Sequence, residues 1–219
     1  VQQGGGNNSN AVTAQTIAQC LSALTQPDTA TIRHAEAELK PILKMPDSMM
    51  LLWQVIVSQT TSNNTADQTG GTTSSTFYYE IAIRHVACIV LRKRLPAHYA
   101  ASFDAATKTA WLQQVLQQTA IETVRPVQTA LVAVAAALQQ VDQTAAQPVL
   151  QFLSAAVNNP NPAAQELCFL LLQEMTDTVG LHWKEHLPAL QQLFHSTLHL
   201  PNNTNNTTNV DAQGNTVTA

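Results

Sequence analysis

The chain has 219 residues, of which 45% are apolar, 11% are charged and 5% are aromatic. Its length allows a hydrophobic core, and its many Ala, Leu, Gln and Thr residues favour helices that pack through small and aliphatic side chains. The formal net charge is -4 and the only basic cluster is Arg92, Lys93 and Arg94, which disfavours direct nucleic-acid binding and favours a basic protein as cargo.

The first two predicted helices form a hairpin. Apolar residues recur at helical spacing over Ala14–Leu24, the sequence Gln26-Pro27-Asp28 interrupts them, and the same period resumes over Thr29–Lys44. Pro41 lies inside this second segment, where a proline removes a backbone hydrogen bond and clashes with the preceding turn. We therefore expect the second helix to end early or to kink at Pro41.

The next predicted hairpin contains a long insert. Its first helix follows Pro46-Asp47, with an apolar stripe made of Met49, Leu52, Trp53 and Ile56. The segment Thr60–Thr76 has no apolar period and contains Gly70-Gly71, so we predict a solvated loop. Helical periodicity resumes over Thr76–Leu95, and we expect Pro96 to end that helix.

The rest of the chain repeats the same pattern. We predict a helix around Trp111, Val115 and Leu116, then helices over Val124–Val141, Gln147–Val157 and Ala163–Val179, with Gly180 as a C-cap. One unpaired helix is expected over His182–Leu200. Helix pairs spaced by roughly 40 to 45 residues are typical of HEAT and armadillo arrays. The predicted fold is therefore all-α, an α-solenoid of HEAT/armadillo-like helical hairpins with about four and a half repeats over residues 11–200.

The two ends of the chain are predicted to be disordered. No membrane-spanning segment is predicted. Residues 1–10 are polar and rich in Gly and Asn, and residues 201–219 are of low complexity. The longest apolar run, Thr129–Leu138, is about half of the roughly 20 residues that span a bilayer.

The cysteines Cys20, Cys88 and Cys168 are far apart in apolar helical segments, which indicates buried free thiols and a reducing compartment.

Three segments resemble the N-terminal signature of the importin-β (karyopherin-β) nuclear transport receptors. They are AEAELKPIL (residues 35–43), MPDSMMLLWQVI (45–56) and EIAIRHVACIVLRKRLP (80–96), so the resemblance covers the first two repeats. It implies a binding scaffold that is not an enzyme, uses no cofactor, and shuttles through the nuclear pore between cytoplasm and nucleus. Its partners would be the GTP-loaded form of the small GTPase Ran, basic protein cargo and nuclear pore proteins. The LRKRLP sequence is most similar to the branch that carries ribosomal proteins and histones.

The resemblance also assigns a binding face. In this family the second helix of each pair, the B helix, lines the concave face, and the first B helices bind Ran. Here these would be 29–44, 76–95 and 123–141. Their polar residues are the candidate Ran-binding residues: Arg33, Glu36, Lys40, Arg84, Arg92, Lys93, Arg94, Arg125 and Gln128. An ordinary alternative is a solvated helix face, or, for Arg92–Arg94, cations that offset the dipole at the C-terminal end of their helix.

The chain also departs from this family. The insert 60–76 is not a family feature. The chain begins at Val1 and holds fewer repeats than a complete receptor, so we expect it to be part of a longer protein in which cargo selection can lie elsewhere.

The alternatives to a transport receptor are a zinc peptidase and another kind of HEAT-repeat scaffold. The sequence His182-Trp183-Lys184-Glu185-His186 matches the H-x-x-E-H pattern of zinc peptidases, whose third ligand is a downstream acidic residue. Only Asp211 follows, in the predicted tail, so we expect neither bound metal nor catalysis. A HEAT-repeat scaffold of the phosphatase or vesicle-coat type is the main alternative function. Such scaffolds share the fold but do not ordinarily carry the AExxL and LRKRLP motifs.

Overall fold

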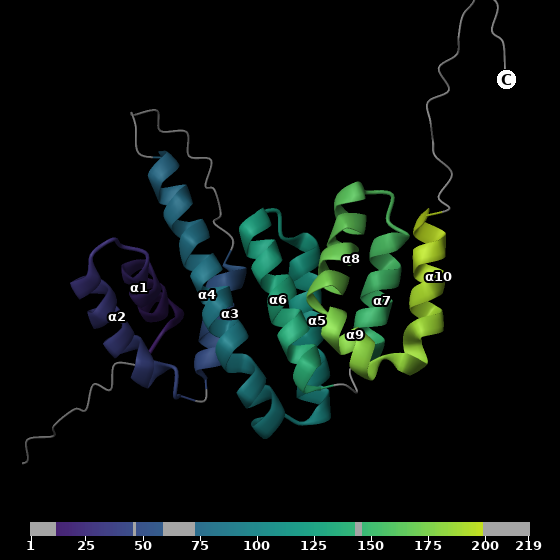
Figure 1. The fold of residues 1–219 in the computed structure, drawn as a ribbon. Coiled ribbons are helices and arrows are strands. Elements are labelled where there is room, and N and C mark those ends of the chain that lie inside the picture. The colour runs from purple at the N-terminus through teal and green to yellow at the C-terminus, as the bar shows by residue number, and fades with distance from the viewer. Residues whose placement is uncertain (1–11, 46, 59–72, 143–145, 199–219) are drawn as a thin grey trace, which may run out of the picture. The chain divides into compact units, whose positions relative to one another are not determined.

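The computed structural model describes residues 12–45, 47–58, 73–142 and 146–198 (Figure 1). This part of the chain is helical and contains no strand. It divides into two compact units, of which the first ends at Lys184 and the second begins at Glu185. The predicted disordered ends, 1–10 and 201–219, lie outside the described residues.

Nine α-helices are described in the first unit. They are α1 (Ala14–Leu24), α2 (Thr29–Ile42), α3 (Ser48–Val57), α4 (Thr73–Ser102), α5 (Ala105–Ile121), α6 (Arg125–Val141), α7 (Ala146–Val157), α8 (Pro162–Glu174) and α9 (Thr176–His182). The second unit contains α10 (Leu187–Leu198), and a short 3-10 turn, η2 (Lys184–His186), spans the boundary. Side chains of Thr13, Asp28, Asp104 and Asn161 accept hydrogen bonds from the first turns of α1, α2, α5 and α8, which fixes where these helices begin.

The helices of the first unit stack as hairpins in two layers. Within hairpins, α1 packs on α2, α3 on α4, α5 on α6 and α7 on α8. Between hairpins, α1 packs on α3 and α5 on α7, whereas α4 packs on α6 and α6 on α8 (Figure 1). We call α1, α3, α5 and α7 the odd layer, and α2, α4, α6 and α8 the even layer. This solenoid-like stack of helical hairpins confirms the predicted fold class.

Helix α6 lies at the centre of the stack. It contacts α4, α5 and α8, and every residue from Leu131 to Ala136 is buried. Residues 131–138 of this helix are all apolar, which is expected of a segment contacted from several directions. Pro126 lies in the first turn of α6, where its missing N–H has no helical partner to lose.

Helix α4 differs from its prediction at both ends. It begins at Thr73, so residues 73–76 of the predicted loop are helical, and 60–72 lie outside the described residues. The predicted stop at Pro96 is wrong, because α4 continues through Pro96 to Ser102. Leu95 and Tyr99 are fully buried on either side of the proline, and the Tyr99 hydroxyl donates to the carbonyl oxygen of Lys108 at 3.2 Å. This packing outweighs the hydrogen bond that Pro96 removes.

The prediction for residues 163–200 is also corrected. Instead of one helix ending at Val179, α8 ends at Glu174 and α9 follows, so Gly180 lies inside α9 and is not a C-cap. The predicted helix over His182–Leu200 is interrupted at Trp183, and α10 begins only at Leu187. Pro188 lies in the first turn of α10, the helical position that proline favours, and it cannot donate a hydrogen bond to the preceding turn.

Candidate partner-binding surface

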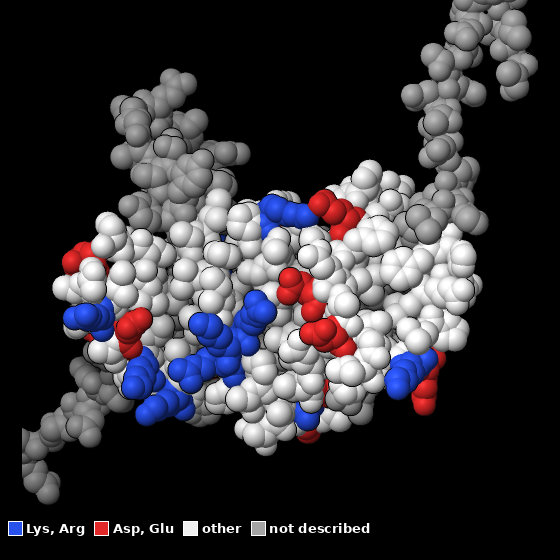
Figure 2. Space-filling view, in the orientation of Figure 1, with Lys and Arg blue, Asp and Glu red and all other residues white. Residues whose placement is uncertain are grey.

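Charged residues are distributed unequally between the two layers. The odd layer carries a single charged residue, Lys108, in the whole length of its four helices. Helices α2 and α4 of the even layer carry Arg33, Glu36, Glu38, Lys40, Glu80, Arg84, Arg92, Lys93 and Arg94. Figure 2 shows basic side chains grouped on this face, with acidic side chains beside them. Since charged side chains are absent from most of the odd layer, the even layer is the surface able to recognise a charged partner.

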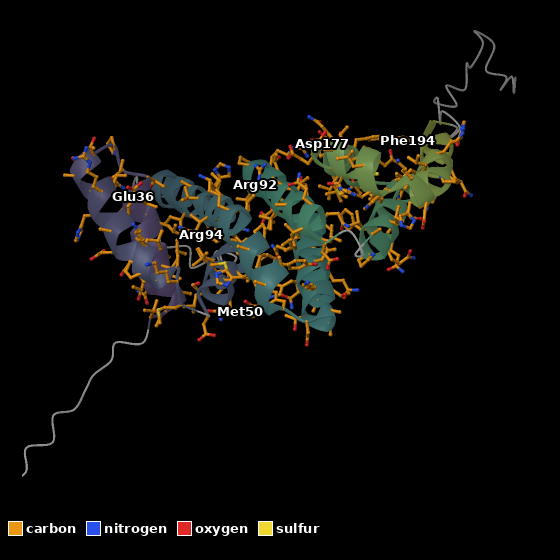
Figure 3. All side chains as sticks on the ribbon, turned by 60° about the horizontal axis from the view of Figure 1, so that its bottom comes forward. Glu36, Met50, Arg92, Arg94, Asp177 and Phe194 are labelled. Carbon is orange, nitrogen blue, oxygen red and sulfur yellow. The ribbon has the colours of Figure 1, made fainter. Side chains whose placement is uncertain are left out.

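The AExxL motif divides α2 into a buried and an exposed side. Ala35 and Leu39 are buried, whereas Arg33, Glu36 and Lys40 are exposed and recur at spacings of three and four residues. The structure thus brings the three α2 candidates onto one stripe of the even layer, with Glu36 labelled in Figure 3.

Arg92, Lys93 and Arg94, here called the basic triplet, lie in the middle of α4. All three are exposed, between the fully buried Leu91 and Leu95. Among the described residues, no ion pair joins the triplet to an acidic group. Consecutive helical residues are about 100° apart, so the triplet spreads across the exposed arc of the helix, with Arg92 and Arg94 on different sides (Figure 3).

The length of α4 removes the ordinary explanation for the triplet. Cations offset a helix dipole within the last turn. Because α4 continues to Ser102, its last turn contains no basic residue, and the triplet lies well before it. The alternative that Arg92–Arg94 serve as C-terminal cations is therefore wrong.

Arg84 is not a surface residue, and its assignment as a binding residue is corrected. It is 8% exposed, its Nε donates to the carbonyl oxygen of Ile56 at 2.8 Å, and its Nη2 pairs with the carboxylate of Glu122. Glu122 also accepts from the backbone N–H of Val124 at 3.0 Å and from the side chain of Gln118 at 3.5 Å. This buried network joins α3, α4 and the end of α5. Glu122 was not predicted as a site residue. Its only signal in the sequence is a carboxylate directly after a predicted helix rich in Gln and apolar residues.

Arg125 and Gln128 are held by neighbouring groups at the start of α6. Arg125 is exposed, pairs with Glu166 of α8, and donates to Gln128 Oε1 at 3.2 Å. Gln128 Nε2 donates to the carbonyl oxygens of Thr119 at 3.2 Å and Glu122 at 3.0 Å, the last turn and C-cap of α5. Gln128 therefore has a structural role, whereas the guanidinium of Arg125 remains on the surface.

A groove runs between α4 and α6 in the even layer. We call it the α4–α6 groove. Arg92 and Ile89 line it from α4, Arg125 and Ala130 line it from α6, and Glu174 lies at its α8 side. Its volume is about 480 Å³, enough for several side chains of a partner. The groove brings two candidate residues together, Arg92 and Arg125, which are far apart in the sequence.

The three cysteines are free and buried, as predicted. Burial raises the pKa of Cys88 to about 12 and that of Cys168 to about 11, and burial together with the nearby Glu38 carboxylate raises the pKa of Cys20. The thiols are therefore protonated at neutral pH, and thiols in this state are poor nucleophiles and poor metal ligands. In the parts of the chain that the structure describes, no cluster of three His, Cys, Asp or Glu side chains could hold a metal ion, and no helix is both long and apolar enough to cross a membrane.

The H-x-x-E-H sequence does not lie on one helix. His182 is the last residue of α9 and His186 belongs to η2, so the helical one-turn spacing that a zinc peptidase requires is lost. We expect the double variant His182→Ala/His186→Ala to have the same metal content as the unchanged chain, measured by atomic emission on purified protein. Stoichiometric zinc that disappears in the variant would contradict this expectation.

Comparisons with protein-family models, with curated proteins and with solved structures give no match for this chain.

Proposed function

We propose that this chain is the N-terminal part of a nuclear transport receptor that binds the GTP-loaded form of a Ran-type small GTPase and supports nuclear import of protein cargo. The exposed basic triplet in the middle of α4 is the observation that carries the proposal. It forms the LRKRLP motif, lies on the layer of B helices, and has no acidic partner among the described residues. A charged group kept exposed and unpaired, away from a helix end, is available to a partner.

The binding face consists of the triplet together with Arg33, Glu36 and Lys40 of α2 and Arg125 of α6. Arg84 and Gln128 support this face from inside, because their polar groups are engaged within the protein. Basic cargo, nuclear pore proteins and shuttling between cytoplasm and nucleus belong to the same proposal. A HEAT-repeat scaffold of the phosphatase or vesicle-coat type has the same fold, but nothing in such a role requires recognition of a nucleotide state.

Nucleotide preference is therefore the property to measure. The complete chain should bind a Ran-type GTPase loaded with a non-hydrolysable GTP analogue more tightly than the GDP-loaded protein, since only differential affinity can couple nucleotide state to cargo exchange. Reversing the triplet (Arg92→Glu, Lys93→Glu, Arg94→Glu) should weaken binding of the GTP form about ten-fold or more, because each exposed charge contributes up to about 1 kcal/mol and about 1.4 kcal/mol is ten-fold. Titration calorimetry at two salt concentrations measures both effects.

Lys108→Glu is the control, since Lys108 is the one charged residue in the helices of the odd layer. Its ammonium lies over the ring of Tyr99 of α4, 5.7 Å from the ring centroid, but Lys108 is not part of the proposed binding face. The variant reverses a charge outside that face and should leave the affinity for the GTPase unchanged. Equal affinity for the two nucleotide states, measured on a folded monomeric sample, would contradict the proposal and favour the HEAT-scaffold alternative.

A further inference from the structure

We propose that the α4–α6 groove binds an acidic segment of a partner protein that carries an apolar side chain between its carboxylates. The inference rests on the proposed function only in that both require a protein partner on the even layer. Three features of the groove support it. They are the small residues of its α6 wall, one exposed aliphatic side chain, and a basic side chain that has no carboxylate partner among the described residues.

The α6 wall of the groove is made of small residues. Pro126, Thr129, Ala130 and Ala133 recur at helical spacing and line the groove, while the larger Leu131, Val134 and Leu138 of the same helix are fully buried on its other sides. Although α4 and α6 pack closely, the small side chains along this stripe of α6 leave space between the two helices at the protein surface. The space that results is open to a side chain from outside.

The α4 wall exposes an aliphatic side chain. Ile89 is 39% exposed and lies between His85 and Arg92, four residues after the first and three before the second, so all three share one helical stripe. Residues 86–91 are all apolar, and Ile89 is the one among them that is exposed. Together with Ala130 and Ala133 it forms an apolar patch on which an apolar side chain of a partner loses water contact.

The cations at the groove favour carboxylates. Arg92 has no acidic partner among the described residues, and Lys93 and Arg94 follow it directly. Arg125 already pairs with Glu166, and Glu174 is the one carboxylate that lines the groove. Within the described part of the chain, Arg92 is thus the groove cation without a carboxylate partner, and a planar guanidinium can bind a carboxylate through two parallel hydrogen bonds. An apolar contact beside a carboxylate contact specifies both the chemistry and the register of the segment.

The test uses the complete chain and a defined probe, a short peptide of glutamates around one central leucine, labelled with fluorescein at its N-terminus and amidated at its C-terminus. Fluorescence anisotropy should detect binding of this peptide. Arg92→Glu should weaken it about ten-fold, and Ala130→Leu should weaken it similarly by filling the apolar part of the groove. Lys44→Glu is the matched control, because it makes the same change in charge at an exposed position outside both the groove and the proposed binding face, and should have little effect. Circular dichroism verifies that the variants are folded.

Several outcomes would overturn the proposal. The first is no binding of the peptide. The second is an equal loss of affinity with Lys44→Glu and Arg92→Glu, which would indicate diffuse electrostatics. The third is equal binding of a peptide with alanine in place of leucine. The fourth, measured by sedimentation, is that the chain dimerises and that Arg92→Glu abolishes the dimer. That result would identify a second copy of the chain as the occupant of the groove and overturn the assignment to a partner protein. The GTPase titration is independent of the peptide titration, so loss of nucleotide preference with retained peptide binding rejects the proposed function alone, and the reverse result rejects the groove alone.

Discussion

Glu122→Ala should lower the free energy of unfolding by about 3–5 kcal/mol, the cost of breaking a buried ion pair by removing one partner. The variant leaves the guanidinium of Arg84, which is 8% exposed, without its counter-charge, and the backbone N–H of Val124 loses its acceptor. Urea unfolding followed by circular dichroism measures the change. Arg84→Ala should cost a similar amount, since it strands the carboxylate of Glu122 and the carbonyl oxygen of Ile56.

The control is an ion pair of the same chemistry on the surface. Arg125 and Glu166 have side chains that are 45% and 61% exposed, so Glu166→Ala should cost at most about 1 kcal/mol. The double variant Arg84→Met/Glu122→Leu should recover much of the loss of either single change, because apolar side chains of similar size leave no buried charge. Comparable small losses for Glu122→Ala and Glu166→Ala would show that the buried network does not join the two hairpins.

Trp111→Ala should lower the free energy of unfolding by about 3–5 kcal/mol, as expected when a large buried aromatic side chain is removed. Trp111 of α5 is 6% exposed and contacts Trp53 of α3 edge-on, with ring centroids 5.7 Å apart. It also stacks on Phe103, which contacts Tyr99 at the end of α4. This aromatic cluster holds the part of α4 beyond Pro96 against α5.

Local opening distinguishes this effect from general destabilisation. In the Trp111→Ala variant, amide hydrogen exchange should accelerate in residues 97–102 more than in the N-terminal part of α6, because the end of α4 has lost its aromatic support. Phe169→Ala removes an aromatic side chain that is 41% exposed and should cost much less. Uniform acceleration of exchange across the first unit would contradict a specific role of the cluster in extending α4.

Periodicity in the sequence located most helices within a few residues. The apolar spacing in α1, α2, α3, α6 and α7, together with side-chain caps such as Asp28, marks local boundaries because these signals depend only on residues one turn apart. Exposure of the basic triplet was also predictable. Leu91 and Leu95, four residues apart, define the buried side of α4 and leave the positions between them outside.

Tertiary packing decided the features that matter most for the candidate site. Burial of Arg84 depends on Glu122, which lies 38 residues away in the sequence, and no local pattern connects them. Continuation of α4 past Pro96 depends on Tyr99 and on the aromatic cluster around Trp111, contacts that outweigh an unfavourable local preference. That continuation places the basic triplet inside the helix and not at its end. The packing of α4 on α6 places Arg92 across the groove from the small residues of α6. The sequence alone therefore determined which side of each helix is apolar, whereas long-range contacts determined which charges stay inside and which remain for a partner.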